Sequence, residues 1–471
     1  MKKYGLIILG QGAAAFAAAI KANDLGVKTA MVGGNATQGA VIGGTCVNVG
    51  CLPSKNLITV ANAFYHAANN SFEGIAYGKG KLDFKKVIER KDKLVEKFRK
   101  EKYAGLLKSL GNVTFIEGKS RFISKTSVEV NGQEIEGEKF IVAVGARSQI
   151  IPVKGIENID YLTNEEALSL RELPESLCVV GGRALGLEFA QLFAHFGTKV
   201  TVLQRSDRII PEEEPEISEL LKQYLEEEGI EIYTGMSITG VRKSGGKKIV
   251  NFTAGGKAKE IEVDHILFAT GRRPNTDGMN LEKAGVELDR KGFVKVNNEM
   301  QTSAPHIWAA GDVIGEPMLE TIAAKEGAIA AENAFTQNKK KIDFNVIPHA
   351  IFTYPEVASV GSTDAQAIGN GVTCRCGVIP FSFVPKAHII GDTRGIIKVV
   401  ADSRTKKIVG VHILAPHAAD IIHEGTLAVK FGLTVDDIID TVHVFPTLSE
   451  AVKLAAQSFY KDVSKLSCCT E

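Results

Sequence analysis

The sequence predicts an α/β protein with two Rossmann-like βαβ units and a separate C-terminal α+β domain. Runs typical of buried strands alternate with helix-period runs through the first 330 residues, which indicates parallel sheets with crossover helices. Two segments, 4–32 and 177–203, share one pattern of strand, glycine-rich turn, helix and strand. From about residue 345 short β-type runs are punctuated by proline and followed by a helix-period run over 449–462. A chain of 471 residues is long enough for about three domains.

The composition is that of an ordinary globular protein and argues against several function classes. Hydrophobic residues make up 44% and charged residues 24% of the chain, and 56 basic residues are balanced by 55 acidic ones. A net charge of +1 without a basic block disfavours electrostatic binding to nucleic acid or to an anionic membrane. No segment reaches the roughly 18 uninterrupted apolar residues of a membrane span, and we expect a cytoplasmic protein.

The N-terminus resembles a signal peptide at first sight, because two lysines precede an apolar run. Glycines interrupt that run where a nucleotide-binding turn would lie, so we interpret 4–9 as a buried strand and the Ala-rich continuation as a helix. The turn reads Gly10-x-Gly12-x-x-Ala15. Its glycines permit a sharp turn and let a pyrophosphate approach the helix N-terminus, which predicts a dinucleotide site.

The first unit departs from the usual dinucleotide pattern at one position. An acid that binds the ribose hydroxyls is expected about 20 residues beyond the glycines. The second strand instead ends in Gly33, Gly34 and Asn35. We therefore expect another group, either Asn35 or backbone amides, to hold the ribose.

The second unit carries Gly181 and Gly186, with Arg183 in place of the middle glycine. Its acid position is occupied by Gln204, followed by Arg205, with Arg208 close by. Arginines at this position suit a 2′-phosphate, which favours NADPH over NADH. The alternative is that both arginines are solvated surface charges.

The segment GGTCVNVGCLPSK contains Cys46 and Cys51, followed by Pro53 and Lys55. Two cysteines across so short a loop can form and break a disulfide, and a thiolate at a helix start near a cation has a lowered pKa. The alternatives are two buried cysteines or half of a zinc site. No second Cys-x-x-Cys and no clustered His pair supports zinc.

Together these motifs, with ATGRRPN, AAGD, FTYPEVASVG and PTLSEA, resemble the FAD-dependent pyridine nucleotide-disulfide oxidoreductases over the whole chain. The resemblance implies a homodimer whose active sites are completed across the subunit interface. It implies that Cys51 is the sulfur nearest the flavin, that Cys46 meets the substrate, and that Lys55 lies by the flavin and pairs with Glu188.

The resemblance also implies the remaining binding residues and the domain limits. FAD is expected at Gly10, Gly12, Ala15, Gly44, Thr45, Lys55, Gly145 and Asp312. NADPH is expected at Gly181, Gly186, Glu188, Arg205, Arg208 and Gly271. The FAD domain is expected over 1–150 and 277–344, the NAD(P)H domain over 151–276, the dimerisation domain over 345–462 and a cysteine tail over 463–471.

The C-terminal region distinguishes the branches of this family. Its disulfide-reducing members carry a catalytic His immediately before the Pro of the PTLSE-like segment, oriented by a Glu. Here that position is Phe445, which cannot transfer a proton, whereas Glu450 is retained. His443 lies two residues away, and we interpret it as structural, with a displaced base as the alternative.

The tail contains adjacent Cys468 and Cys469, an ending that closely resembles that of the family members that reduce Hg(II). Thiolates are soft ligands that suit this ion. The resemblance implies that the tail captures Hg(II) and passes it to Cys46 and Cys51 of the partner subunit, where NADPH provides the electrons for Hg(0). The alternatives are incidental cysteines, or a thiol relay to a large disulfide substrate.

Two departures from the Hg(II)-reducing branch concern aromatic hydroxyls near the metal. Ala184 and Phe445 stand where many of its members have tyrosine. The N-terminal metal-binding domain of many members is also absent, so we expect Hg(II) to arrive on small thiols or on a separate carrier.

Two other function classes remain as alternatives. One is an NAD(P)H-dependent disulfide reductase of the dihydrolipoyl dehydrogenase or thioredoxin reductase kind, and the other is a flavin-free thiol protein that sequesters soft metals. Of the remaining cysteines, Cys374 and Cys376 alternate on a predicted strand and are expected on one face, as core or interface residues. Cys178 is expected in a buried strand.

Overall fold

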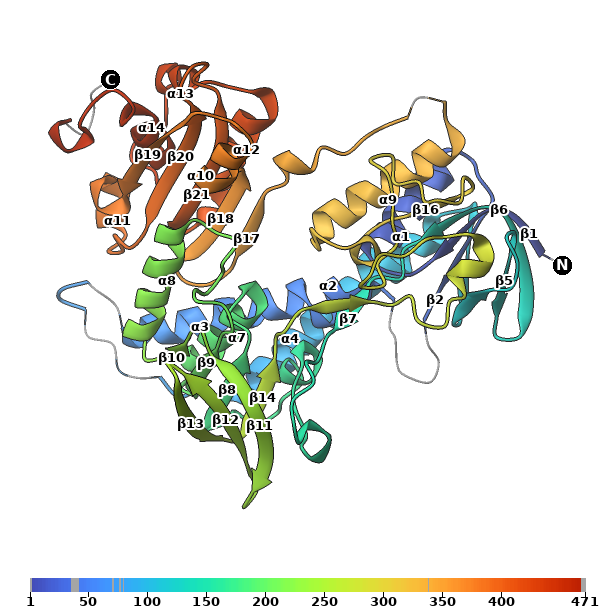
Figure 1. Cartoon of the computed structure of the whole chain (residues 1–471), viewed down its shortest axis with the longest axis horizontal. Coiled ribbons are helices and arrows are strands. Elements are labelled where there is room, and N and C mark those ends of the chain that lie inside the picture. The colour runs from blue at the N-terminus through green and yellow to red at the C-terminus, as the bar shows by residue number, and fades with distance from the viewer. Residues whose placement is uncertain are drawn as a thin grey trace. The chain divides into compact units, whose positions relative to one another are not determined.

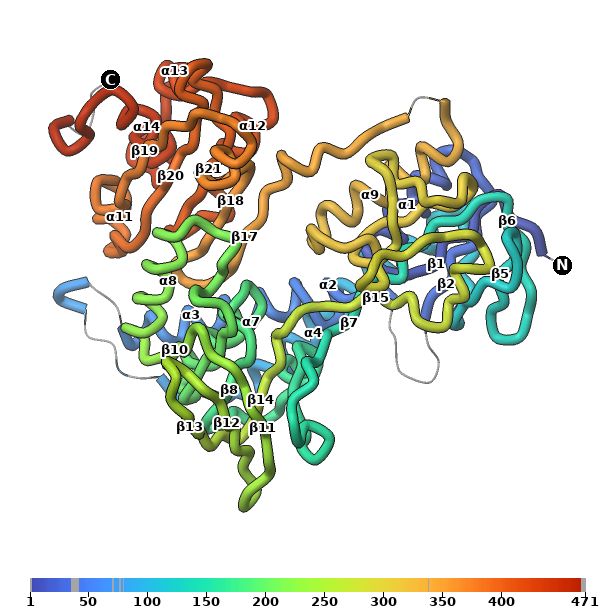
Figure 2. Tube along the Cα trace, in the orientation of Figure 1, coloured from blue at the N-terminus to red at the C-terminus, as the bar shows by residue number. Residues whose placement is uncertain are grey.

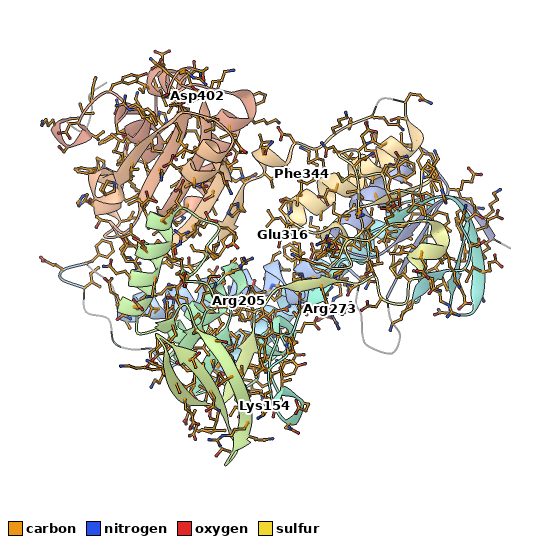
Figure 3. The ribbon with its side chains drawn as sticks, in the orientation of Figure 1. Lys154, Arg205, Arg273, Glu316, Phe344 and Asp402 are labelled. Atoms are coloured by element: carbon orange, nitrogen blue, oxygen red, sulfur yellow. The ribbon has the colours of Figure 1, made fainter. Side chains whose placement is uncertain are left out.

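The computed structural model describes residues 2–34, 42–69, 72–75, 78, 80–337 and 339–466. The chain divides into two compact units, each made of three stretches (Figures 1 and 2). The first unit comprises Met1–Asn56, Ile88–Ile150 and Thr270–Asp343. The second comprises Leu57–Val87, Ile151–Ala269 and Phe344–Glu471, and its last stretch begins at the Phe344 that is labelled in Figure 3.

The first unit is built on a seven-stranded sheet of order β3-β2-β1-β6-β5-β4, with β16 also paired to β6. Strands β3, β2, β1, β6 and β16 run parallel, as the predicted βαβ unit requires. The strands are β1 (Lys2–Leu9), β2 (Thr29–Gly33), β3 (Val113–Glu117), β4 (Ser120–Phe122), β5 (Ser127–Val130), β6 (Gln133–Val142) and β16 (Ile307–Ala309). A separate pair consists of β7 (Ala146–Ser148) and β15 (Arg272–Pro274).

Helices α1 (Ala13–Asp24) and α9 (Glu320–Phe335) pack side by side in this unit (Figure 1). A Cβ atom on Gly327 would lie 2.0 Å from the carbonyl oxygen of Ala14, so only glycine permits this approach. The redox segment forms α2 (Gly44–Val49) and the start of α3 (Cys51–Ala68). A further helical stretch is continuous but changes type, as α4 (Phe84–Phe98), a π-helical stretch (Arg99–Ala104) and α5 (Gly105–Ser109).

The second unit contains another parallel sheet, of order β10-β9-β8-β14, against which α7 (Ala184–Phe196) packs. Its strands are β8 (Ser176–Val180), β9 (Lys199–Leu203), β10 (Glu231–Tyr233) and β14 (His265–Phe268). An antiparallel sheet is formed by β11 (Ser237–Ser244), β12 (Lys247–Ala254) and β13 (Lys257–Val263).

The C-terminal part of the second unit is a five-stranded antiparallel sheet of order β17-β18-β21-β20-β19. Its strands are β17 (His349–Ile351), β18 (Glu356–Gly361), β19 (Cys374–Pro380), β20 (Ile396–Asp402) and β21 (Ile408–Ala415). Its helices are α10 (Asp364–Gly369), α11 (Pro385–Ile389), α12 (Ala418–Phe431), α13 (Val435–Asp440) and α14 (Glu450–Gln457). Buried aliphatic side chains between sheet and helices form its core. The predicted fold class, two Rossmann-like domains and an α+β domain, is confirmed.

Among the described residues, no helix is both long and apolar enough to cross a bilayer.

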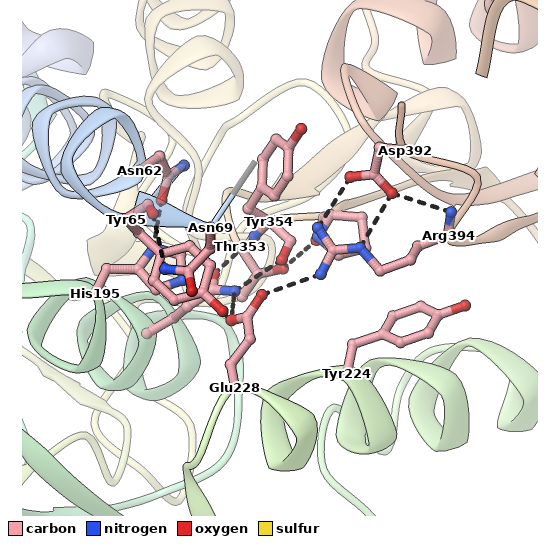
Figure 4. Close-up of polar contacts among 12 residues, drawn as sticks. Asn62, Tyr65, Asn69, His195, Tyr224, Glu228, Thr353, Tyr354, Asp392 and Arg394 are labelled. Carbon is pink, nitrogen blue, oxygen red and sulfur yellow. Dashed lines mark hydrogen bonds and ion pairs between the residues drawn. The ribbon is translucent and has the colours of Figure 1, made fainter. Parts of the chain in front are cut away.

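A buried carboxylate connects several elements of the second unit (Figure 4). Glu228, directly after α8 (Pro215–Glu227), accepts a hydrogen bond from Gln191 Nε2 at 2.7 Å and lies 3.1 Å from His195 Nε2. Its other oxygen binds Arg394 Nη1 at 3.0 Å. Burial alone would raise the pKa of Glu228, but hydrogen bonds from His195 and Gln191 and the charge of Arg394 lower it below its ordinary value.

We predict that Glu228→Gln lowers the free energy of unfolding by about 2 kcal/mol near neutral pH, because it removes one of the two carboxylates that pair with the half-buried Arg394 and leaves only Asp392. The lowered pKa means that this contribution is present above the ordinary Glu pKa and is lost as the pH falls through the folded-state pKa. Urea denaturation at neutral and acidic pH measures the difference. Glu226→Gln, on the exposed Lys222 pair of the same helix, should change stability little, and equal effects of the two variants would contradict this assignment.

Candidate active site

The two cysteines of the redox segment lie on consecutive helices. Cys46 lies in α2, and Cys51 is the first residue of α3. Gly50 separates the helices, and a Cβ atom there would lie 2.9 Å from the carbonyl oxygen of Thr45. Both cysteines are free thiols; Cys46 is half-buried and Cys51 is exposed. The predicted pairing of these two residues in one site is therefore present.

Helix α2 is fixed to the first glycine turn by close backbone contact. The amide of Gly43 donates to the carbonyl oxygen of Gln11 at 3.1 Å. A Cβ atom on Gly44 would lie 2.6 Å from Gly12 Cα, so any larger residue would push the helix away from the turn. Asn48 Nδ2 closes the helix by donating to the Gly44 carbonyl at 2.7 Å. The redox segment thus has one position relative to the dinucleotide turn.

A carboxylate completes the group around the thiols. The Cys46 thiol donates to Glu320 Oε2 at 2.6 Å, and the Tyr103 hydroxyl lies 3.5 Å from Glu320 Oε1. The ligand atoms of Cys46, Cys51 and Glu320 all lie within 4.8 Å of one another. Glu320 is the first residue of α9 and is 274 positions from Cys46, so the sequence motifs did not predict its place in this site. The sequence feature that could have indicated Glu320 is an acidic residue at the start of the helix that follows the Gly-Asp turn.

The environment of the pair assigns opposite protonation to the two sulfurs. The adjacent Cys46 thiol lowers the pKa of Cys51, burial opposes this, and the nearby Lys55 charge lowers the pKa further, with a net shift below the ordinary value. The pKa of Cys46 is raised, because Cys51, burial and the Glu320 carboxylate all favour the neutral thiol. Of the two sulfurs, Cys51 is therefore the more readily ionised, and Cys46 is the one that more strongly retains its proton.

The first glycine turn has the shape that a pyrophosphate requires. Gly10 has φ +143°, and a Cβ atom there would lie 2.0 Å from the carbonyl oxygen of Ala143. Ala15 is fully buried, and Gly145 has φ +68°. The buried oxygen of the Gln11 side chain has no hydrogen-bond partner among the described residues. A cradle that side chains would fill, with an unsatisfied polar atom, fits a bound dinucleotide.

Two carboxyl groups, those of Asp312 and Glu326, lie at the Gly-Asp turn after β16. Asp312 Oδ2 lies 3.2 Å from Arg272 Nε. Glu326 accepts a hydrogen bond from the Gly311 amide at 2.7 Å. Burial, aided by the Asp312 charge and opposed by the Gly311 amide, raises the pKa of Glu326 to about 7. Glu326 is a further buried carboxyl group whose place beside the Gly-Asp turn the sequence motifs did not predict.

The strand next to β2 supplies an acid close to the position where the expected ribose-binding acid is missing. Gly33 ends β2 and pairs in register with Glu117, which ends β3. A Cβ atom on Gly34 would lie 3.0 Å from Glu117 Cγ. The absence of a side chain at Gly34 therefore leaves room for the Glu117 carboxylate. Asn35, the other candidate, lies outside the described residues.

The second glycine turn has the same construction as the first. A Cβ atom on Gly181 would lie 2.3 Å from the Ala269 carbonyl oxygen, and one on Gly186 would lie 1.8 Å from the Gly181 carbonyl oxygen. Arg183, which replaces the middle glycine, has φ −100° at the N-cap of α7, a conformation open to any residue. Gly271 has φ +110°. The departure at Arg183 therefore brings no backbone strain.

The position that usually holds a ribose acid is used here for folding. Gln204 is buried, and its side-chain oxygen accepts the amide of Gly182 at 2.8 Å. Arg205 is exposed (Figure 3), and Arg208 is half-buried with Nη2 3.4 Å from the Pro211 carbonyl oxygen. Directly after β9 the acid position holds Gln204, and two cations follow with Asp207 between them, which suits a phosphate more than a ribose hydroxyl.

Two predicted catalytic acids have structural hydrogen bonds. Glu188 is buried in α7 and accepts the amide of Phe352 at 2.9 Å. Its predicted pairing with Lys55 joins residues of the two units and stays a prediction. Glu450 accepts the amide of Thr447 at 3.0 Å at the start of α14.

The C-terminal turn presents no imidazole at the position of the catalytic His. Phe445 is 49% exposed, so its ring is available to a partner and is not part of the core. His443 Nε2 lies 2.8 Å from Glu424 Oε1, and Nδ1 lies 3.0 Å from the Thr441 carbonyl oxygen. Both ring nitrogens of His443 are engaged locally, which supports the structural interpretation of this residue.

The other cysteines divide into three groups. Cys468 and Cys469 lie outside the described residues. Cys374 and Cys376 lie on one face of β19 as predicted, but they are half-buried and not part of the core. Cys178 is fully buried in β8, as predicted.

Comparison with known proteins decides the family. The chain matches the models of the pyridine nucleotide-disulphide oxidoreductase over residues 4–327 and of its dimerisation domain over 347–456. The chain belongs to the pyridine nucleotide-disulphide oxidoreductase family. The predicted family is confirmed, and with it FAD and a nicotinamide dinucleotide as the family's cofactors and a homodimer as the family's assembly.

Similar members of the family differ in activity. The chain is 42% identical to a mercuric reductase of Lysinibacillus sphaericus, over 99% of this chain and 84% of that protein. It is 40% identical to a dihydrolipoyl dehydrogenase of Thermus scotoductus, over 98% of each. A solved Cu(II) complex of the HOCl-induced flavoprotein disulfide reductase RclA from Escherichia coli has a TM-score of 0.87 and 28% identity, covering 98% of this chain and 100% of that one.

We predict that Cys51 is alkylated at lower pH than an ordinary thiol and that Cys46 is not. The thiolate is the reactive form, and the lowered pKa keeps Cys51 ionised where a free cysteine is protonated. The measurement is iodoacetamide labelling of the NADPH-free, pre-reduced protein against pH, with peptide mass spectrometry. The buried Cys178 serves as the internal unreactive control. Earlier labelling of Cys46 than of Cys51 would contradict the assignment.

Proposed function

We propose that this enzyme reduces Hg(II) to Hg(0) with electrons from NADPH and so detoxifies mercury. The observation that carries the proposal is a group of two sulfurs and one carboxylate within 4.8 Å of one another, at Cys46, Cys51 and Glu320, with Phe445 in place of a proton-transferring His. The relative from Lysinibacillus sphaericus, a mercuric reductase, supports the same function.

The absence of an imidazole favours a metal ion over a disulfide as substrate. When a disulfide is reduced, the leaving sulfur must be protonated, which the family's His provides. Hg(II) accepts two electrons and needs no proton. The balance is NADPH and Hg(II) giving NADP⁺, H⁺ and Hg(0). Phe445 therefore removes a group that disulfide reduction requires and that metal reduction does not.

The chain offers soft ligands where the ion must be held. Cys46 and Cys51 would bind Hg(II) through sulfur once the Cys46 proton is released, and the Glu320 carboxylate that accepts this thiol hydrogen bond lies ready to take the proton. The tail cysteines, Cys468 and Cys469 of the partner subunit, would capture Hg(II) from small thiols and transfer it by ligand exchange.

The cofactors are assigned to the residues of the two glycine turns. FAD, which when bound passes electrons between a nicotinamide and the thiol pair, would be held in 1–150 and 277–344 by the first turn, with Asp312 on its ribityl chain. Glu117 would take the place of the missing ribose acid, because its side chain lies beside Gly34. NADPH would be held in 151–276, with Arg205 and Arg208 on its 2′-phosphate.

A disulfide reductase is the second candidate, because the Thermus scotoductus relative at 40% identity is a dihydrolipoyl dehydrogenase. In that case another group would replace the missing His. The two candidates differ in substrate, and one assay separates them.

The test is anaerobic NADPH oxidation by the purified enzyme with Hg(II) in excess small thiol, beside Cu(II), lipoamide and glutathione disulfide. We expect sustained turnover only with Hg(II). Cys468→Ala/Cys469→Ala should retain turnover at low thiol and lose most of it when thiol is abundant, because ligand exchange from the tail is then required. Sustained turnover of a disulfide, with Hg(II) acting only as an inhibitor, would overturn the proposal.

We predict that Arg205→Ala/Arg208→Ala lowers kcat/KM for NADPH by roughly tenfold or more and leaves that for NADH within about twofold, because the lost contacts are to the 2′-phosphate. The measurement is the NADPH to NADH ratio of kcat/KM. Arg242→Ala is the matched control, because Arg242 is an exposed arginine that pairs with Glu260 on the antiparallel β11-β12-β13 sheet, away from β9. An equal loss with both nucleotides would contradict the assignment of these arginines.

A further inference from the structure

A second group of thiols and a carboxylate lies on the C-terminal sheet, in the compact unit that does not contain Cys46. Cys374 and Cys376 are two residues apart on the edge strand β19, so their side chains share a face. Asp364 begins α10 beside this face. The Sγ atoms and a carboxylate oxygen of these three residues all lie within 4.8 Å of one another.

The carboxylate is held in place by its own surroundings. The Cys374 thiol donates to Asp364 Oδ1 at 2.6 Å. The Asp364 amide donates to the buried Glu214 at 2.6 Å, and Thr363 caps α10 through a reciprocal pair of hydrogen bonds with Gln366. The backbone that carries Asp364 is therefore fixed independently of the contact between its carboxylate and the thiol. A rigid ligand position of this kind favours metal binding over an incidental contact.

The charges around the group leave it ready to accept a cation. Lys398 Nζ lies 4.0 Å from Asp364 Oδ2 but is already bound to Glu214 at 2.9 Å and Glu216 at 3.0 Å. Burial and the Asp364 charge raise the pKa of both thiols, that of Cys376 to about 12. Without a metal the thiols are therefore protonated, and a cation must displace two protons to bind both sulfurs.

The ligand set and its access select the kind of ion. Two sulfurs with one carboxylate oxygen suit a thiophilic divalent ion such as Zn(II), Cd(II) or Hg(II), not Mg(II) or Ca(II). Two metal–sulfur bonds of about 2.3 Å at a tetrahedral angle place the sulfurs about 3.8 Å apart, a separation that lies inside the 4.8 Å limit of the cluster. A surface hollow of about 400 Å³ reaches Cys374 from the solvent and is lined by Ile368, Gly371, Val372, Thr373 and Cys374.

We propose that Cys374, Cys376 and Asp364 form a second site, distinct from the redox pair, that binds one thiophilic divalent metal ion. Binding forms two metal–sulfur bonds and one metal–oxygen bond and releases the two thiol protons, without any change of oxidation state. The site does not depend on the proposed Hg(II) reduction, because it holds for any activity of the Cys46 site.

The test is a Cd(II) titration of the full-length holoenzyme in which Cys46, Cys51, Cys468 and Cys469 are replaced by serine. The protein is fully reduced and kept anaerobic, and the ultraviolet sulfur-to-cadmium charge-transfer band is followed. We expect one Cd(II) per chain with this band, and its complete loss in the added Cys374→Ser/Cys376→Ser variant. Absence of the band, or its survival in that variant, would overturn the proposal.

A conservative pair of variants separates metal binding from folding. Asp364→Asn should weaken Cd(II) binding by roughly tenfold, since it removes one charged ligand of three. Asp402→Asn is the matched control, because Asp402 pairs in register with Cys374 but its carboxylate accepts the amides of Arg404 and Thr405. FAD content and thermal melting check that both variants are folded. Equal affinities in the two variants would remove Asp364 from the site.

Discussion

The close contact between α2 and the first glycine turn is the constraint on which the rest of the redox centre depends. A Cβ atom on Gly44 would lie 2.6 Å from Gly12 Cα, so the helix reaches its position only because Gly44 lacks a side chain. The helix that carries Cys46 is thereby fixed to the turn that would cradle the FAD pyrophosphate. The break at Gly50 then starts a new helix at Cys51, and the two sulfurs are brought together.

The two sulfurs and their neighbours divide the chemistry among themselves. The Cys46 thiol and the Lys55 charge lower the pKa of Cys51, whereas Glu320 accepts a hydrogen bond from the Cys46 thiol. In this arrangement Cys46 is a thiol whose proton has an acceptor, the Glu320 carboxylate, within hydrogen-bond distance. Phe445 stands where the family's disulfide-reducing members carry a proton-transferring His, a group that reduction of a disulfide requires and that reduction of a soft metal ion does not.

The sequence predicted those parts of the site that are local in the chain. Both glycine turns, the cysteine pair on its helices and the strand position of Cys374 and Cys376 follow from spacing of a few residues. Glu320 and Glu117 could not be predicted, because helix packing and strand pairing bring them to their sites from distant parts of the chain. Asp364 lies only 10 residues before Cys374, but no motif indicated that the loop between α10 and β19 would bring the two together. Arg183 shows the reverse case, in which a departure from the motif proved harmless because its backbone needs no glycine.

The account's central claim is that Cys46 and Cys51 transfer the electrons of NADPH to a bound metal ion. The most direct measurement is the mercury vapour released per NADPH oxidised in a sealed anaerobic cell. The account predicts one Hg(0) for each NADPH with the native enzyme and no vapour with Cys46→Ser. NADPH oxidation without mercury vapour, or undiminished vapour release by the Cys46→Ser enzyme, would contradict it.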